Sequence, residues 1–208
     1  MKTSILLVVL ALMAGQSATL PADLDPVSRA RLPYLQRKDI DEKSLPTFDT
    51  LPGLGKDGVL KGPLAFAAYN QGVAKALFDL HNAAVAGALT PHVRELAIMV
   101  ACRETNYNLE WNGHEATALR NGVDAKTLDV IRKRGALAGL DENDALVIRF
   151  GRQLFTAKKM EPATFAKAVE LFGRKGAMDL VAVMITYADS GFYGIAVDEH
   201  PAPGKPAL

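Results

Sequence analysis

Four side chains able to take part in chemistry lie at helical spacing in the middle of the chain. Tyr107, Glu110, Trp111 and His114 fall at i, i+3, i+4 and i+7, so they share one face of a helix. A core stripe would ordinarily hold Leu or Val, and a solvent stripe Lys and Glu. Glu110 and His114 form an i,i+4 pair in which the carboxylate can orient the imidazole and favour its protonated form. The stripe predicts either a polar core network or a site for acid/base chemistry.

A second carboxylate, Glu95, lies 19 residues before His114. The residues at i+3, i+4 and i+7 from Glu95 are apolar, so its own helix face is apolar. A carboxylate there is expected to be at least partly buried, and burial requires a partner or a raised pKa. A structural bond to Arg94, to Arg103 or to a neighbouring helix end would supply that partner equally well.

Helix signals place both carboxylates and the imidazole on two consecutive helices. Thr90-Pro91 is a start signal for a helix that runs to about Glu104. Asn106 or Asn108 is expected to cap the next helix, which ends at Asn121-Gly122. Because the connecting turn is short, the two helices are expected to pack as antiparallel neighbours. Facing side chains of this hairpin could then meet in one pocket.

The same region resembles the carboxymuconolactone decarboxylase family, part of the alkylhydroperoxidase-D-like superfamily. The likeness covers roughly residues 60–195, is sharpest at 91–123, and rests on Arg94-Glu95, Tyr107, Glu110-Trp111, His114 and Asn121-Gly122. The resemblance implies an all-α fold, an alkylhydroperoxidase-D-like helical bundle. It also implies assembly as a homo-oligomer, a trimer or hexamer, with pockets close to subunit contacts.

The resemblance implies a decarboxylase that needs neither a metal nor an organic cofactor if its substrate carries its own electron sink. We expect His114 to be the general acid, held by Glu110, and Glu95 to relay protons or orient the substrate. Trp111 and Tyr107 would wall the pocket of a small-molecule substrate. Arg94 is either a surface residue or an anchor for an acidic substrate.

Three other interpretations stay open. In the peroxidase branch of the superfamily a Cys-x-x-Cys occupies the positions of Tyr107 and Glu110, and Cys102 lies outside that motif without a partner, so thiol chemistry is disfavoured. Glu95, Glu110 and His114 could instead form a metal site, although we expect none. The protein could also be a non-catalytic exported binding module.

The remaining histidines are expected at the surface or in caps: His81, His92 and His200.

The 208 residues divide into four expected segments. Residues 1–18 have a basic start, an apolar run from 5 to 14 and small residues after it, which is typical of a cleaved secretory signal and predicts a periplasmic or secreted protein. An uncleaved N-terminal helix is the alternative. A Pro-rich leader (19–62), a helical domain (63–198) and an extended tail (199–208) follow. Stable membrane insertion after cleavage is not expected.

The charge balance and the cysteine content exclude several classes of protein. Formal net charge is +1, and loss of Lys2 with the signal would leave equal numbers of basic and acidic side chains. The chain has no excess of basic side chains, so nucleic acid is not favoured as a partner. The single cysteine, Cys102, rules out an intrachain disulfide framework.

Overall fold

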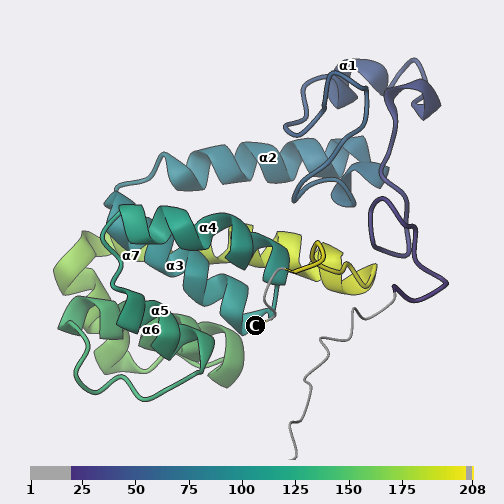
Figure 1. The fold of residues 1–208 in the computed structure, drawn as a ribbon. Helices are drawn as coiled ribbons and strands as arrows, with labels where there is room; N and C mark the ends of the chain where they lie inside the picture. Colours follow the sequence, from purple (N-terminus) through teal and green to yellow (C-terminus); the bar gives the residue numbers. More distant parts are fainter. Residues whose placement is uncertain (1–19, 205–207) are drawn as a thin grey trace, which may run out of the picture.

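The computed structural model describes residues 20–204 and 208, so the expected signal at 1–18 lies outside the described residues. The described part of the chain is all-α, as predicted, and its β-pairing is limited to two isolated bridges. Its helices are drawn in Figure 1 and are, in order, α1 (Leu45–Phe48), α2 (Gln71–Val85), α3 (Pro91–Glu104), α4 (Asn108–Arg120), α5 (Ala125–Arg132), α6 (Glu142–Arg152) and α7 (Pro162–Ala196). Short 3-10 turns occupy Arg37–Asp39 and Ala67–Tyr69, and a π-helical segment, Gln153–Ala157, follows α6. None of the helices described is long and apolar enough to cross a membrane.

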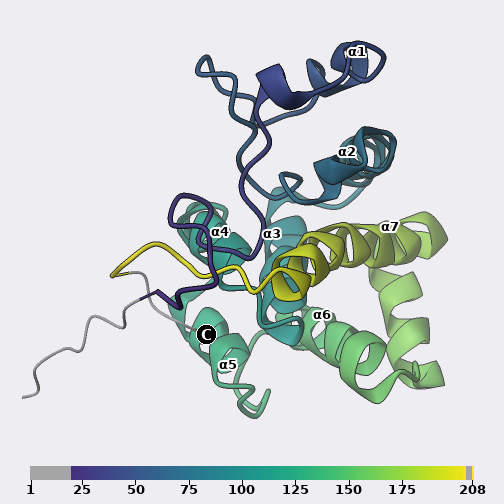
Figure 2. The same ribbon diagram turned by 90° about the vertical axis from the view of Figure 1, so that its right-hand side faces the viewer.

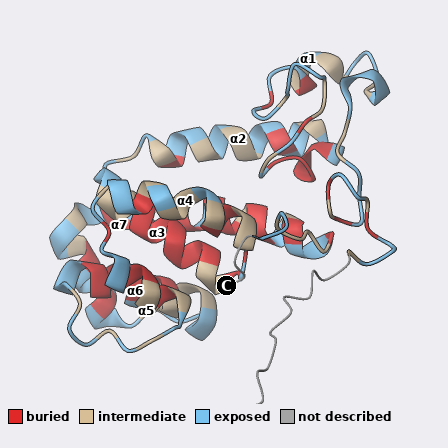
Figure 3. Cartoon of the chain, in the orientation of Figure 1, coloured by how far each residue is buried: buried red, intermediate tan, exposed pale blue. Residues whose placement is uncertain are grey.

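Helix α3 is the centre of the core. Every residue from Glu95 to Cys102 is buried, so this helix has no solvent face over two turns. It packs against α4, α6 and α7, which surround it in Figure 2, and its buried stretch is continuous in Figure 3. A helix that is apolar almost all round is stable only when neighbours cover every side. Glu95 therefore sits on the most enclosed element of the fold.

Local signals set most helix starts correctly. The side chains of Thr90, Asp124 and Asp141 accept hydrogen bonds from backbone N–H groups in the first turns of α3, α5 and α6. The prediction for α4 was wrong, because Tyr107 occupies its N-cap position and makes no side-chain capping bond. Asn106 instead adopts a left-handed backbone with φ of 54° in the turn before it.

Helix α7 combines two segments that the sequence predicts separately, one from about Pro162 and one from about Gly176. The backbone at Gly173 is non-helical, with φ of 70° and ψ of 171°, so a kink divides the two segments. Positive φ values of this kind favour glycine. The second segment carries the buried residues that pack on α3, including Leu180 and Met184.

The leader forms a small core of its own on α2. Phe48, Leu51 and Leu60 are buried with Ala74 of α2, and Tyr193 of α7 packs against the same cluster. A short turn of chain, residues 53–61, is closed by hydrogen bonds between the backbones of its ends, the N–H of Lys61 donating to the carbonyl of Gly53 at 3.0 Å. This turn is called the leader hairpin below. It has a fixed conformation at one end of α2.

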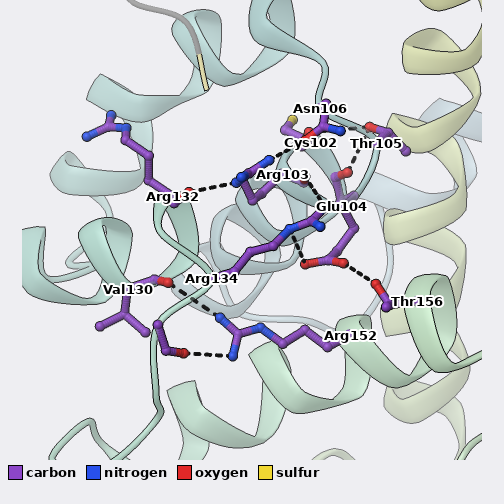
Figure 4. A network of polar contacts seen from close by, with 12 residues as sticks. Cys102, Arg103, Glu104, Thr105, Asn106, Val130, Arg132, Arg134, Arg152 and Thr156 are labelled. Carbon is purple, nitrogen blue, oxygen red and sulfur yellow. Dashed lines mark hydrogen bonds and ion pairs between the residues drawn. The ribbon is translucent and has the colours of Figure 1, made fainter.

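A polar network holds the C-terminal end of α3 in place (Figure 4). Arg103 Nε donates to the carbonyl of Arg132, the last residue of α5, at 2.6 Å. Thr156 of the π-helical segment donates to the Glu104 carboxylate at 2.5 Å, and the Arg134 guanidinium lies 3.8 Å from the same carboxylate. Charged groups that bond to helix-terminal carbonyls also complement the helix dipole. The end of α3 nearest the turn to α4 is therefore fixed to two other elements.

Candidate functional site

His114 lies between two buried carboxylates. Its Nδ1 is 2.9 Å from Glu95 Oε2 on α3, and its Nε2 is 3.4 Å from Glu110 Oε2 one turn earlier on α4. The expected meeting of Glu95 and His114 across the α3–α4 hairpin is thus present in the structure. The Tyr187 ring of α7 packs edge-on against the imidazole, with 5.0 Å between ring centroids. The ring orientation of His114 is fixed from three helices.

The site opens into a cavity of about 430 Å³. The leader, α2, α4 and α7 all contribute to its wall, through Pro52, Gly53, Lys61, Gly62, Pro63, Leu64, Leu77, Phe78, His81, Glu110, His114, Thr186, Tyr187, Asp189 and Ser190. Glu110 and His114 line this cavity, whereas Glu95 does not. His114 Nδ1 is therefore paired with a carboxylate outside the cavity lining, and Nε2 lies beside a carboxylate that belongs to the lining.

The three other predicted site residues have different surroundings. Trp111 is buried and donates to Glu115 at 3.2 Å, and Tyr107 is buried and donates to Glu199 at 2.6 Å. Arg94 donates to the carbonyl of Val85 at 3.2 Å. None of these three lines the cavity. Their bonds are to the protein itself.

Several residues that line the cavity carried no sequence signal for a site. His81, which was expected at the surface or in a cap, lies on the cavity wall of α2, with 5.5 Å between its ring centroid and that of Tyr187. Lys61 comes from the leader hairpin, and Thr186 and Asp189 come from α7. The helical periodicity of α7 indicated a buried stripe but not a cavity beside it.

Burial and charge shift the titration of the two cavity-facing groups. Burial raises the pKa of Glu110 to about 6, against the opposing effect of His114. Burial alone would lower the pKa of His114, but its hydrogen bond to Glu95 and the nearby charges of Glu110 and Glu95 outweigh this and raise it. Burial and the His114 charge lower the pKa of His81. The two shifts are opposite in direction, favouring the protonated form of His114 and the neutral form of His81.

No group of three or more His, Cys, Asp or Glu side chains within residues 20–204 is arranged to hold a metal ion. The two ring nitrogens of His114 face different carboxylates, Nδ1 that of Glu95 and Nε2 that of Glu110. A metal ion bound to one nitrogen would therefore not be directed at both carboxylates. Cys102 is buried in α3, and burial raises the pKa of its thiol well above the usual value. A buried thiol with a raised pKa is a poor nucleophile.

Residues 71–147, which contain α2 to α5 and the first turns of α6, match the carboxymuconolactone decarboxylase family. This helical region belongs to that family. The match includes Glu95, Glu110 and His114, and excludes the leader hairpin and α7. No curated protein sequence matches the chain.

A solved structure of the same fold extends the comparison beyond the family region. It is a cysteine-to-alanine variant of the debrominase Bmp8 in complex with 2,3,4-tribromopyrrole, with a TM-score of 0.60, 15% identity, and coverage of 80% of this chain and 89% of that chain. At this identity the similarity concerns the fold, which is that of an alkylhydroperoxidase-D-like bundle. That structure is an enzyme of the same fold. In this chain, Glu95, Glu110 and His114 lie within the family match, and the leader and α7 complete the cavity from outside it.

Unfolding experiments can test the raised pKa of Glu110. We expect the free energy of unfolding to fall as the pH rises from about 4.5 to above 6, because a group with a raised folded-state pKa binds its proton more strongly when folded, and that stability is lost on deprotonation. His114, also raised, loses its contribution at higher pH, above its ordinary value of 6.5. Urea unfolding of the protein and of Glu110→Gln across this range measures the difference. An equally steep pH dependence in the variant would contradict the assignment.

Proposed function

We propose that the protein is a cofactor-independent carbon–carbon lyase that decarboxylates a small lactone acid or related carboxylic acid. The observation that carries the proposal is that His114 lines the cavity, with its Nδ1 held by the buried Glu95 and its Nε2 beside Glu110, a second lining residue. The Nε2 contact with Glu110 is 3.4 Å, looser than the 2.9 Å contact at Nδ1. A ligand in the cavity can therefore compete with Glu110 for the Nε2 proton while the Glu95 contact keeps the ring oriented.

The proposed reaction needs only groups of this chain and of the substrate. The bond between the carboxylate carbon and its neighbouring carbon breaks, and carbon dioxide leaves. The electron pair moves into the conjugated lactone carbonyl, whose oxygen becomes an enolate. His114 Nε2 then gives its proton to the carbon end of the enolate, and solvent reprotonates the imidazole. The conjugated lactone carbonyl is the electron sink, so no metal or organic cofactor is needed.

Lys61 supports an acidic substrate. It is the one Lys or Arg side chain among the cavity-lining residues of the described chain, and its ammonium group is 3.2 Å from the Asp57 carboxylate. Both side chains are about half exposed, so this surface ion pair contributes little stability and can exchange for a substrate carboxylate. Arg94, the anchor considered from the sequence, bonds to a backbone carbonyl instead.

We expect Lys61→Gln to raise KM about tenfold and to change kcat less than about threefold, since a charged hydrogen bond to a substrate carboxylate that is kept in the product acts before and during the reaction alike. Lys56→Gln is the matched control, because Lys56 is an exposed lysine of the same hairpin that does not line the cavity. Steady-state kinetics with a γ-carboxylactone measure both constants. Equal KM values for the two variants would remove Lys61 from substrate binding.

The activity itself is tested by incubating the purified protein with 4-carboxymuconolactone and following carbon dioxide release and product by NMR. Turnover that depends on His114 supports the lyase. Saturable thermal stabilisation by the lactone without product would point to a binding module. Peroxide consumption that depends on Cys102 would point to a peroxidase, although the burial of this thiol disfavours that activity. The bound tribromopyrrole of Bmp8 supports the size of ligand proposed, a single small ring.

We further propose, from the apolar run and small residues of segment 1–18, that the protein is exported to the periplasm or the medium. Cell fractionation with an antibody against the full-length protein tests this. The proposed substrate would then be one available outside the cytoplasm.

A homo-oligomer is proposed as well. Met178, Ile185 and Phe192 of α7 recur every seventh residue and are each about half exposed, as is Ile195. Large apolar side chains aligned on one helix face favour contact with another protein surface. The molecular mass in solution, measured by light scattering, tests whether copies of this chain provide that contact.

A further inference from the structure

Two oxygen atoms of α7 that line the cavity have no hydrogen-bond partner among the residues that the structure describes. They are Thr186 Oγ1 and Asp189 Oδ2, each shielded from solvent at the atom. Thr186 is only 4% exposed, and Asp189 follows it three residues later on the same helix face. The other Asp189 oxygen accepts from Ser190 Oγ at 3.2 Å. Within the described chain, one donor-acceptor group and one acceptor, three residues apart on α7, thus have no partner.

Such an arrangement is uncommon because buried polar atoms in native proteins nearly always find a partner. A threonine inside a helix usually bonds to the carbonyl one turn earlier, which would satisfy Thr186 without any ligand. Here the hydroxyl does not make that bond within α7. The acid/base machinery of Glu95, Glu110 and His114 does not use either atom, so the catalytic proposal leaves them unexplained.

We propose that Thr186 and Asp189 form a subsite for a hydroxyl group of the ligand. The ligand hydroxyl donates to Asp189 Oδ2 and accepts from Thr186 Oγ1, so one group satisfies both atoms. An N–H group could only donate to the two oxygens and would leave the Thr186 hydroxyl proton unused, and an ether or ketone oxygen could accept but not donate. A hydroxyl is therefore the chemical group that complements the pair.

The surroundings favour this assignment at neutral pH. Burial raises the pKa of Asp189 to about 6, so above that pH it is a carboxylate and a strong acceptor. The leader hairpin contributes Lys61 to the same cavity, and α2 contributes two apolar lining residues, Leu77 and Phe78. The acidic end of the ligand rests on the proposed function. With a hydroxyl subsite added, the substrate class is a hydroxylated small carboxylic acid.

Calorimetric titration with benzoate, 3-hydroxybenzoate and 4-hydroxybenzoate tests the subsite, because these rigid acids differ only in the presence and position of a hydroxyl. We expect the protein to bind one hydroxybenzoate about tenfold more tightly than benzoate. Thr186→Val and Asp189→Asn should each remove most of that preference and leave the affinity for benzoate within about twofold. Thr164→Val, the same substitution on α7 at a residue that does not line the cavity, should keep the preference.

Thermal unfolding separates a binding role from a structural one. Thr186→Val should melt at the same temperature as the wild-type protein or higher, because the lost hydroxyl had no partner in the described part of the protein. A marked fall in Tm would indicate an internal partner and overturn the subsite. So would equal affinity of the wild-type protein for all three acids, no binding of any of them, or a preference that both variants retain.

The result is distinguishable from failure of the lyase proposal, because binding requires no turnover. If decarboxylation is wrong, no form of the protein consumes the lactone but the hydroxyl preference remains. If the subsite is wrong, His114-dependent turnover can persist while the preference is absent.

Discussion

His114→Gln is expected to lower kcat by about 10²–10⁴, the usual contribution of a positioned general acid. Glutamine is close in size and can still bond to Glu95, but it carries no proton that it can transfer. KM should change less, because the carboxylate anchor, Lys61, is on a different wall of the cavity. Stopped-flow or NMR assays of lactone turnover measure the loss.

His200→Gln is the matched control, because His200 is in the tail and does not line the cavity. Its kcat should equal that of the wild-type protein. Circular dichroism and thermal unfolding must show that His114→Gln is folded. A folded His114→Gln that turns over at the wild-type rate would remove the imidazole from the mechanism, whatever the cavity binds.

Trp111→Ala is expected to reduce the free energy of unfolding by about 3–5 kcal/mol, the range for truncation of a large buried aromatic side chain. Trp111 is 1% exposed. Its indole N–H donates to Glu115, and the Arg132 guanidinium lies 4.9 Å from the centre of its ring. The substitution would leave a large void in the core beside α4. It would also remove the ring that both Glu115 and Arg132 contact. Urea unfolding gives the difference directly.

Trp111→Phe separates the structural role from a role in the pocket wall. It keeps an aromatic ring in the core but lacks the indole N–H, so we expect a smaller stability loss and a KM equal to that of the wild-type protein. A raised KM with unchanged stability would show that Trp111 contacts the substrate after all, and would require a different cavity in the working enzyme.

The sequence alone determined the hairpin that carries the acid/base residues. Thr90, Pro91 and Gly122 begin and end helices through interactions within a few residues, and such signals act in the same way in any surroundings. The 3.6-residue period then puts Glu110 and His114 on one face, and the short turn puts Glu95 opposite them. The helical fold and the Glu95–His114 pair follow from these local rules.

The tertiary structure decided which neighbour covers each helix face, and periodicity carries no information about that. Tyr107 and Trp111 share a stripe with His114, yet neither lines the cavity. Tyr107 bonds to Glu199 and Trp111 bonds to Glu115. A stripe is wide enough for its residues to meet different surroundings. The cavity wall also joins the leader hairpin, α2 and α7, which are far apart in the chain. The leader, α2 and α7 enclose the cavity together with α4, and contacts between such distant segments depend on the complementarity of whole surfaces and not on any local spacing.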